Sequence, residues 1–369
     1  MTLLTIRAGA SAYRQIQRDG LAPEHISSVF GASGAAKWLA IYGLDRAIFS
    51  QWLAPVKHPI NLFGTSVGAF KLAAACHRDA GRGLDALAEA YIQQSYPKGV
   101  TADTIELEFR KILQVTLGDD KVGQILSHPT FRFGCGAVRC HGGLASANPR
   151  RQTAACSRAA VKNMRGRAAL RNQLERVVFH DPRASFPLDV HDGRAPDGYR
   201  TETVALNEEN LPPGLKASGS IPVYMHGVKD IPGAGAGVYR DGGLLDYHPV
   251  PGNFWRAEEG LILYPHFYPD CKEGWFDKFL PWRKAAPHLL DRAVLIYPTP
   301  RFFAATQLGR VPDRQDFARF ADSPSRPHNN AERIRLWQEV ADKSHLLGQE
   351  FLQLSDSGEL AKRVRPLGL

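Results

Sequence analysis

Short apolar runs and helix-spaced apolar positions alternate along the N-terminal part of the chain. The apolar stretch 26–30 leads into the glycine-punctuated segment Gly31-Ala-Ser-Gly34. Apolar residues then recur at helical spacing between Trp38 and Ile48. An apolar run, a glycine turn and a helical period in this order predict a strand, a tight turn and a helix.

The same order of patterns repeats immediately downstream. Residues 59–63 predict a second strand, residues 64–68 (Gly-Thr-Ser-Val-Gly) a sharp turn, and residues 69–77 a second helix. Two successive βα units favour a parallel sheet with helices packed on its faces. The sequence therefore predicts an α/β fold with a mostly parallel central sheet.

Further elements are expected in the rest of the chain, which we interpret as one domain covering residues 1–369. Helical periodicity indicates helices at 84–94 and 103–115, and a C-terminal covering helix and tail at 331–369. Residues 129–187 carry mixed signals, and we interpret them as an insertion or cap within the domain. Strand-like segments occur at 202–206, 223–228, 238–240, 261–264 and 294–297.

Composition is typical of a globular protein. The 369 residues are 44% hydrophobic and 22% charged. A run of roughly 18 apolar residues, as a transmembrane helix needs, does not occur, and no secretory leader pattern is visible. A cytoplasmic location is therefore expected, and the five irregularly spaced cysteines are interpreted as reduced thiols.

The positive net charge of +9 is concentrated in one segment. Between Arg150 and Arg176 there are eight lysines and arginines and a single acid, Glu175. Such a surface attracts anionic lipid headgroups or nucleic acid, although the commoner arrangement is a solvated helix face. Aromatic residues do not alternate with these charges, so nucleic acid is not an expected partner.

The clearest candidate for catalytic chemistry is Ser66, at the turn between the second predicted strand and its helix. A nucleophilic serine needs its hydroxyl held out at a strained strand-to-helix turn, where flanking small residues such as Gly64 and Gly68 avoid clashes. The helix that follows directs free N–H groups and its positive end toward a developing oxyanion. The alternative interpretation is a serine that only caps the helix.

The candidate base for Ser66 is Asp241. It follows the predicted strand 238–240 and precedes Gly242 and Gly243, which permit close backbone approach. An ordinary Asp-Gly turn is the competing interpretation. His248 and His266 follow strands and are the candidates for a Ser-His-Asp triad, but few strands precede the serine, unlike in the usual triad fold.

Taken in order, these signals resemble the patatin-like phospholipase family. The shared features are the loop 31–34, the turn 64–68, the segment Ala217-Ser-Gly-Ser-Ile-Pro222, and Asp241-Gly-Gly243. The resemblance covers roughly residues 26–251, with a weak stretch between about 129 and 200. It implies a three-layer α/β/α fold and a Ser66–Asp241 catalytic dyad without histidine.

The family's oxyanion loop is a run of glycines followed by a basic residue, and this chain departs from it. Alanine and serine replace two glycines, and Lys37 stands for the basic residue that supports the loop. The resemblance implies that the oxyanion hole is built from main-chain N–H groups of Gly31, Ala32, Ser33, Gly34 and Val67.

Cofactors and metals are not expected. The loop 31–37 resembles a Walker A loop, but it ends in Ala36-Lys37-Trp38 and lacks the required Gly-Lys-Ser/Thr. Four further residues lack the paired cysteine spacing of a structural zinc site, namely Cys135, Cys140, His141 and Cys156.

The function that the resemblance implies is hydrolysis of lipid esters, such as phospholipid or lysophospholipid acyl chains. Transient contact with an anionic membrane surface would suit the aromatic and cationic stretches 272–284 and 301–303, for which burial in the core is the alternative. Two other functions stay open, a patatin-shaped interaction or regulatory module without turnover and a triad esterase. The pattern indicates no oligomeric state.

Overall fold

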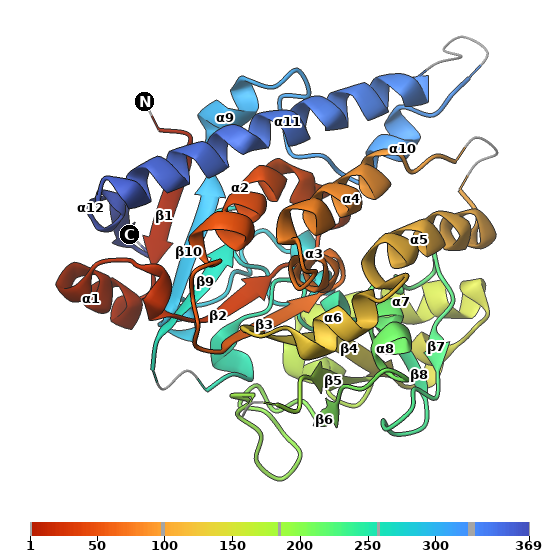
Figure 1. Ribbon diagram of the computed structural model, residues 1–369. Coiled ribbons are helices and arrows are strands. Elements are labelled where there is room, and N and C mark those ends of the chain that lie inside the picture. Colours follow the sequence, from red (N-terminus) through yellow and green to blue (C-terminus); the bar gives the residue numbers. More distant parts are fainter. Residues whose placement is uncertain (1, 97–99, 184–185, 257–258, 324–328, 369) are drawn as a thin grey trace.

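A mixed, mostly parallel sheet runs through the centre of the protein (Figure 1). The computed structural model describes residues 2–96, 100–183, 186–256, 259–323 and 329–368. In this part of the chain eleven strands form one sheet, in the order β11-β1-β10-β9-β2-β3-β4-β5-β6, with β8 and β7 branching from β4. The strands are β1 (Leu4–Ala8), β2 (Ile26–Gly31), β3 (Ile60–Thr65), β4 (Phe131–Cys140), β5 (Leu174–His180), β6 (Thr201–Ala205), β7 (Val228–Lys229), β8 (Val238–Asp241), β9 (Leu261–Pro265), β10 (Ala293–Pro298) and β11 (Val364–Pro366).

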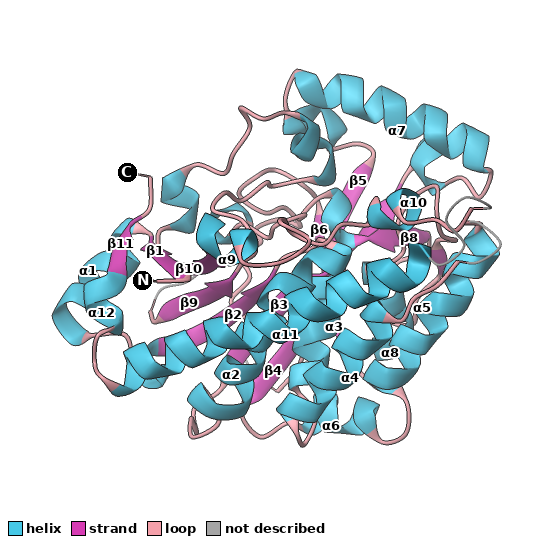
Figure 2. Ribbon diagram, turned by 90° about the horizontal axis from the view of Figure 1, so that it is seen from above, coloured by secondary structure: helices cyan, strands magenta, loops and turns pink. Residues whose placement is uncertain are grey.

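Helices cover both faces of the sheet in a three-layer α/β/α arrangement, as predicted. Figure 2 shows α2, α3, α4 and α11 along one side of the strands and α7 on the opposite side. The helices of the described residues are α1 (Ala10–Asp19), α2 (Tyr42–Ala47), α3 (Val67–Ala75), α4 (Ala80–Ile92), α5 (Ala102–Leu117), α6 (Lys121–Ser127), α7 (Pro149–Met164), α8 (Leu211–Ser218), α9 (Pro300–Ala304), α10 (Asp316–Arg319), α11 (Asn329–Asp356) and α12 (Leu360–Arg363).

The long strand β4 organises the centre of the sheet. Its first half pairs in parallel with β3, ending at Thr65 opposite Gly136. Its second half pairs with β8 in antiparallel fashion, with Asp241 opposite Ala137. Since β5 takes the other edge of β4 along residues 134–140, β3 and β8 must lie end to end on one edge, and their carboxyl ends meet.

The segment 129–187 differs from its interpretation as an insertion or cap. It supplies β4 and β5, which are internal strands of the central sheet. Glycines and cysteines within β4 hide its strand pattern, yet most of its residues are buried. The described part that lies outside the sheet is α7 with its flanking turns, and Ala155 and Ala159 of this helix pack on a second, smaller core.

The basic stretch between Arg150 and Arg176 is largely a solvated surface. Six of its eight cations are exposed: Arg150, Arg151, Arg158, Lys162, Arg165 and Arg171. Arg176 is fully buried instead and forms ion pairs with Asp197 and Asp246. The surface charge therefore sits on the outer face of α7 and the turn that follows.

Several expected elements are confirmed, and the boundaries shift by a few residues. The two βα units are present as β2 with the short helices of residues 35–52, and as β3 with α3. The covering helix is α11, which packs on α2, and the tail after it returns to the sheet edge as β11 beside β1. The strand expected at 223–228 is wrong except at its last residue, because Val223 lies in a turn at a positive φ of 71° and only Val228 belongs to a strand, β7.

Two findings bear on the expected cellular setting. All five cysteines are buried and unpaired. Among the helices of the described residues, none combines the length and apolar character that a bilayer crossing needs.

The contact between α3 and β2 should be intolerant of any side chain at Gly68. A Cβ built there would lie 2.1 Å from the carbonyl oxygen of Gly31, so helix and strand would have to separate. We expect Gly68→Ala to lower the free energy of unfolding by about 2 kcal/mol or more, the cost of overpacking. The measurement is a urea titration. Gly123→Ala is the matched control, because no atom lies within 4 Å of its added Cβ, and equal stability of the two variants would contradict the expectation.

Candidate active site

Ser66 lies at the sharp turn between β3 and α3. Its backbone has φ 52° and ψ −133°, a conformation that L-residues rarely adopt and that persists where the surroundings enforce it. Its side chain makes no capping hydrogen bond to the helix. The interpretation of Ser66 as a simple helix cap is therefore wrong.

Glycine backbones bring the turn close to its neighbours. An added Cβ on Gly64 would lie 2.5 Å from the carbonyl carbon of Gly68, and one on Gly31 would lie 2.5 Å from the carbonyl oxygen of Gly68. The three glycines thus allow β2, β3 and the first turn of α3 to touch through their main chains. This contact fixes the position from which the Ser66 hydroxyl projects.

Asp241 meets Ser66 at the junction of β3 and β8. The Ser66 hydroxyl donates a hydrogen bond of 2.8 Å to Oδ2 of Asp241. The other carboxylate oxygen accepts the main-chain N–H of Gly243 at 2.7 Å. A Cβ on Gly242 would lie 2.2 Å from the carbonyl oxygen of Gly136, so the Gly-Gly pair lets the chain turn away directly against β4.

The environment of Asp241 makes its carboxylate a stronger base than usual. Burial raises its pKa from 3.8 to about 6, and the hydrogen bonds from Ser66 and Gly243 oppose this rise. The positive charges of Arg314 and Lys278 also favour the ionised form. A carboxylate with a pKa just below neutral pH is ionised at pH 7 and still able to accept a proton.

The turn from Ala217 to Pro222 supports both residues. The main-chain N–H of Ser66 donates to Oγ of Ser218 at 3.0 Å, and that hydroxyl donates to the carbonyl oxygen of Gly136 at 2.7 Å. The main-chain N–H of Asp241 donates to the carbonyl oxygen of Ser220 at 2.9 Å. The sequence marked this segment only through the family resemblance and gave Ser218 no role.

The predicted oxyanion loop is only partly available. Gly31 pairs with Gly64 in the sheet, and the N–H of Ser33 donates to the carbonyl oxygen of Tyr247 at 2.8 Å. Ser33 as an oxyanion donor is therefore wrong in this conformation. Within the described residues, the amides of the other three predicted donors have no hydrogen-bond partner outside the sheet ladders and helices: Ala32, Gly34 and Val67. Gly34 lines the same cavity as Ser66.

Lys37 does not point freely at a phosphate site. Its ammonium forms an ion pair with Asp313, and the side chain is mostly buried. The loop leads into a 3-10 helix, Ala35–Ile41, whereas a phosphate loop leads into an α-helix. Lys37 thus ties the loop after β2 to the segment that precedes α10.

Histidines take no part in the contact between Ser66 and Asp241. Within the described chain, neither residue has a hydrogen bond to a histidine. His248 lines the cavity, but its Nδ1 accepts the main-chain N–H of Lys272 at 2.9 Å. The two histidines singled out from the sequence instead lie beside each other and beside Cys271. The cysteine and histidine group around Cys135 and His141 does not form a comparable cluster in the described residues.

Two cavities open onto Ser66. One has a volume of about 470 Å³, and its lining contains both cations and carboxylates: Lys37, Lys272, Lys278 and Arg314, and Asp241, Asp270 and Asp313. The other has a volume of about 770 Å³. Its walls are mainly apolar and include Phe70, Tyr91, Ile105, Phe109, Ile112, Met225, Phe317 and Trp337. The serine thus stands between a polar space and an apolar space.

Sequence reasoning gave no role at the site to two cations that line both cavities, although one of them, Lys278, lies in the aromatic and cationic stretch 272–284. Lys278, in the 3-10 helix Trp275–Phe279, and Arg314, in a turn before α10, line both cavities and lie far in sequence from either motif. Burial, followed by the charge of Arg314, lowers the pKa of Lys278 to about 8. Residues in short 3-10 helices and turns carry no periodic pattern that would mark them in the sequence.

The comparisons with known proteins assign no family. No family model matches the chain, and no curated protein is significantly similar to it. The roles of Ser66, Asp241 and their neighbours therefore rest on geometry and chemistry.

The buried Asp241 carboxylate should reduce the stability of the fold at neutral pH. Because its pKa is raised from 3.8 to about 6, the folded state holds this proton more tightly than the unfolded chain does. The resulting stabilisation is present below about pH 4 and is lost as the pH rises through 6. We expect Asp241→Asn to have a higher free energy of unfolding than the wild type at about pH 8, with a difference that shrinks toward about pH 4. Urea titrations at both pH values test this, and a variant that is less stable at the higher pH would contradict it.

Proposed function

We propose that this protein is a serine acyl hydrolase that cleaves lipid esters, with Ser66 as the nucleophile and Asp241 as the general base. The observation that carries the proposal is the 2.8 Å hydrogen bond from the Ser66 hydroxyl to a buried carboxylate. The strained turn at Ser66 and the raised pKa of Asp241 support the same assignment. Both features are typical of an activated nucleophile.

The proposed reaction proceeds through an acyl-enzyme. Oδ2 of Asp241 accepts the proton of the Ser66 hydroxyl as Oγ attacks the ester carbonyl carbon. The tetrahedral intermediate collapses, the C–O bond to the leaving alcohol breaks, and Asp241 returns the proton to that alcohol. A water molecule then attacks the acyl-Ser66 ester, with Asp241 again accepting and returning the proton.

The negative charge on the carbonyl oxygen would be stabilised by main-chain N–H groups. Val67 begins α3, so its N–H has no acceptor within the helix. Gly34 lines the cavity from the loop after β2. These two donors, together with the positive end of α3, suit an oxyanion.

The two cavities favour an ester that joins an acyl chain to a polar, anionic part. The apolar cavity of about 770 Å³ accommodates a hydrocarbon chain, and burial of each CH₂ group contributes about 0.8 kcal/mol. The smaller cavity is lined by four cationic and three acidic side chains, and this net positive charge of one favours an anionic group such as phosphate. A phospholipid or lysophospholipid acyl ester has both parts.

Exposed aromatic residues beside the cavities support transient contact with an anionic membrane surface. In the stretch 272–284, Phe279 and Trp282 are 62% and 73% exposed, whereas Phe276 is buried. Phe279 and Lys278 line both cavities. An aromatic and cationic rim of this kind suits the headgroup region of a bilayer. Phe302, in the other stretch, is buried.

A fluorophosphonate probe should modify Ser66. We expect the wild type to be labelled at this residue, and Ser66→Ala to lose both labelling and ester hydrolysis, because the attacking oxygen is gone. Asp241→Asn should lower both rates by at least about a hundredfold. The control is Ser127→Ala, a change on α6 at a residue that lines neither cavity. Labelling that survives in Ser66→Ala, or an intact protein that resists the probe, would contradict the proposal.

The acid limb of the activity profile should report Asp241. Because the base must be ionised, kcat/KM is expected to fall as the pH drops below about 6. The positive charge of Lys278 lowers the pKa of Asp241, so Lys278→Met should move this limb to higher pH. The measurement is kcat/KM against pH for both proteins with an uncharged ester. A limb that stays in place, or one that depends on a histidine variant instead, would contradict the assignment.

Filling the apolar cavity should shorten the preferred acyl chain. Ile105 lies in the wall of the larger cavity, and Ile105→Trp adds volume there. We expect kcat/KM for long-chain esters to fall at least tenfold while that for short-chain esters changes little, because each displaced CH₂ group loses about 0.8 kcal/mol of burial. A panel of esters of increasing length measures this. Val161→Trp, at an exposed position of α7, is the control, and a uniform loss across the panel would place the acyl chain elsewhere.

A further inference from the structure

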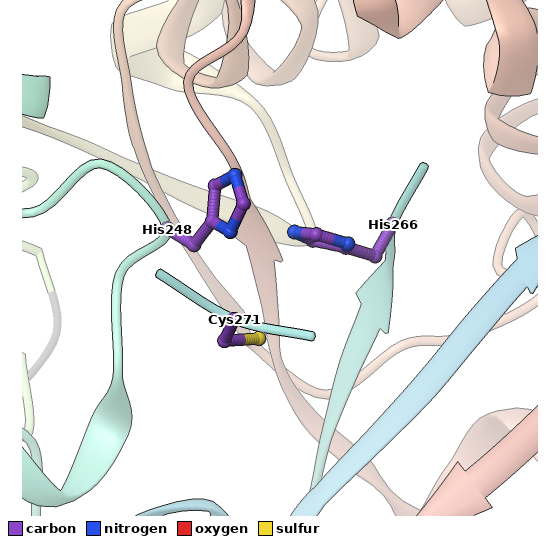
Figure 3. Close-up of side chains that lie close together, drawn as sticks. All are labelled: His248, His266 and Cys271. Atoms are coloured by element: carbon purple, nitrogen blue, oxygen red, sulfur yellow. The ribbon is translucent and has the colours of Figure 1, made fainter. Parts of the chain in front are cut away.

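Three side chains that suit a metal ion gather outside the Ser66–Asp241 pair (Figure 3). His266 directly follows β9, and His248 and Cys271 lie on loops on either side of that strand. One ligand atom from each residue lies within 4.8 Å of the others. The exposed fractions are 1% for His248, 0% for His266 and 3% for Cys271. The cluster is therefore shielded from bulk water.

The two imidazole rings leave polar atoms unsatisfied. Nε2 of His248 and Nε2 of His266 are buried and have no hydrogen-bond partner. Buried polar atoms are paired in the great majority of cases, and an exception indicates a missing partner such as a water molecule or an ion. Nδ1 of His266 lies 2.6 Å from the carbonyl oxygen and 2.9 Å from the main-chain nitrogen of Tyr268, so its contacts suit either tautomer of the ring. Donation of the Nδ1 proton to this carbonyl leaves the Nε2 lone pair free, which is the usual arrangement of a metal-binding histidine.

We propose that His248, His266 and Cys271 bind a thiophilic d¹⁰ metal cation, Zn²⁺ or Cu⁺. Imidazole and thiolate together are ligands that these ions prefer. Tetrahedral bonds of about 2.1 Å to nitrogen and 2.3 Å to sulfur place ligand atoms roughly 3.5 Å apart. The present spacing of up to 4.8 Å closes to this value through small side-chain rotations.

Ion binding would change the protonation of His248 and Cys271. Burial lowers the pKa of His266 to about 4 and that of His248 well below its usual value, so both rings are neutral. Because Nδ1 of His248 accepts the main-chain N–H of Lys272, its proton lies on Nε2 and moves to Nδ1, with loss of that hydrogen bond, before Nε2 binds an ion. Burial raises the pKa of the Cys271 thiol. Binding therefore forms the metal–sulfur bond while the thiol proton leaves to solvent, one proton for each ion bound.

The surrounding charges distinguish the two ions. The negative charge of Asp270 raises the pKa of His266 and of Cys271. The positive charges of Lys37 and Lys272 lower the pKa of His248, and that of Lys71 lowers the pKa of His266. With the Cys271 thiolate, Cu⁺ gives a neutral centre and Zn²⁺ a centre with one positive charge. The neighbouring lysines repel the positive charge that a Zn²⁺ centre keeps and a Cu⁺ centre lacks. A competition between the two ions therefore shows which of them the site prefers.

Cobalt substitution provides a direct test that does not depend on activity. The full-length chain is stripped with a chelator, loaded with one equivalent of Co²⁺ and examined for a thiolate-to-cobalt charge-transfer band and for tetrahedral d–d bands. We expect both bands in the wild type. The charge-transfer band should be absent in Cys271→Ser and present in Cys76→Ser, the control for loss of another buried thiol. Ser66→Ala should bind the metal as the wild type does, so this test and that of the hydrolase can fail separately.

Two further measurements use the unchanged protein. After desalting, elemental analysis should find about one Zn²⁺ or Cu⁺ for each chain. Addition of both ions together to the stripped protein shows which of them is retained in competition. Either ion, but not Mg²⁺, should raise the melting temperature. An absence of retained metal in the wild type, an unchanged melting temperature, or a charge-transfer band that survives in Cys271→Ser would overturn the proposal.

Discussion

The hydrogen bond between Ser66 and Asp241 joins residues 175 positions apart in sequence, and the sheet makes this contact unavoidable. Strand β4 carries β3 and β8 end to end along one edge, so the carboxyl ends of two oppositely directed strands face each other. The serine follows one end and the aspartate is the last residue of the other. A shift of β8 by one residue along β4 would turn the carboxylate to the opposite face of the sheet, so strand register determines whether the pair exists.

Holding these two residues together imposes costs that the surrounding structure offsets. The backbone of Ser66 is strained, and a carboxylate is kept away from water. The main-chain contacts among Gly31, Gly64 and Gly68, and the serine hydroxyl of residue 218, maintain the turn against this strain. A fully buried β2–β3 core lies beneath it. Strain and unfavourable burial at one point of an otherwise well-packed core are typical of a functional site.

The sequence revealed the local parts of this site better than their connection. Both βα units and the turn at Ser66 could be predicted, because apolar periodicity and glycine spacing are local signals. The strand that brings Asp241 to Ser66 could not, since β4 lies in the segment interpreted as an insertion and its glycines and cysteines obscure strand alternation.

The details of the loops were also beyond reach of the sequence. The N–H of Ser33 is taken by Tyr247 and Lys37 is paired with Asp313, and both partners are distant in sequence. The cavity cations and the cluster of His248 with His266 likewise depend on how loops after different strands converge. Such convergence is a tertiary property, so residue patterns alone do not encode it visibly.

The central claim is that the Ser66 oxygen becomes acylated during turnover. The most direct measurement mixes the protein with a long-chain fatty-acyl ester, quenches the reaction in acid within the first turnovers, and analyses the intact mass and the peptides. The account predicts an added acyl mass located on Ser66 in the wild type and none in Ser66→Ala. Ester hydrolysis that proceeds without an acylated Ser66, or with the acyl group on another residue, would contradict it.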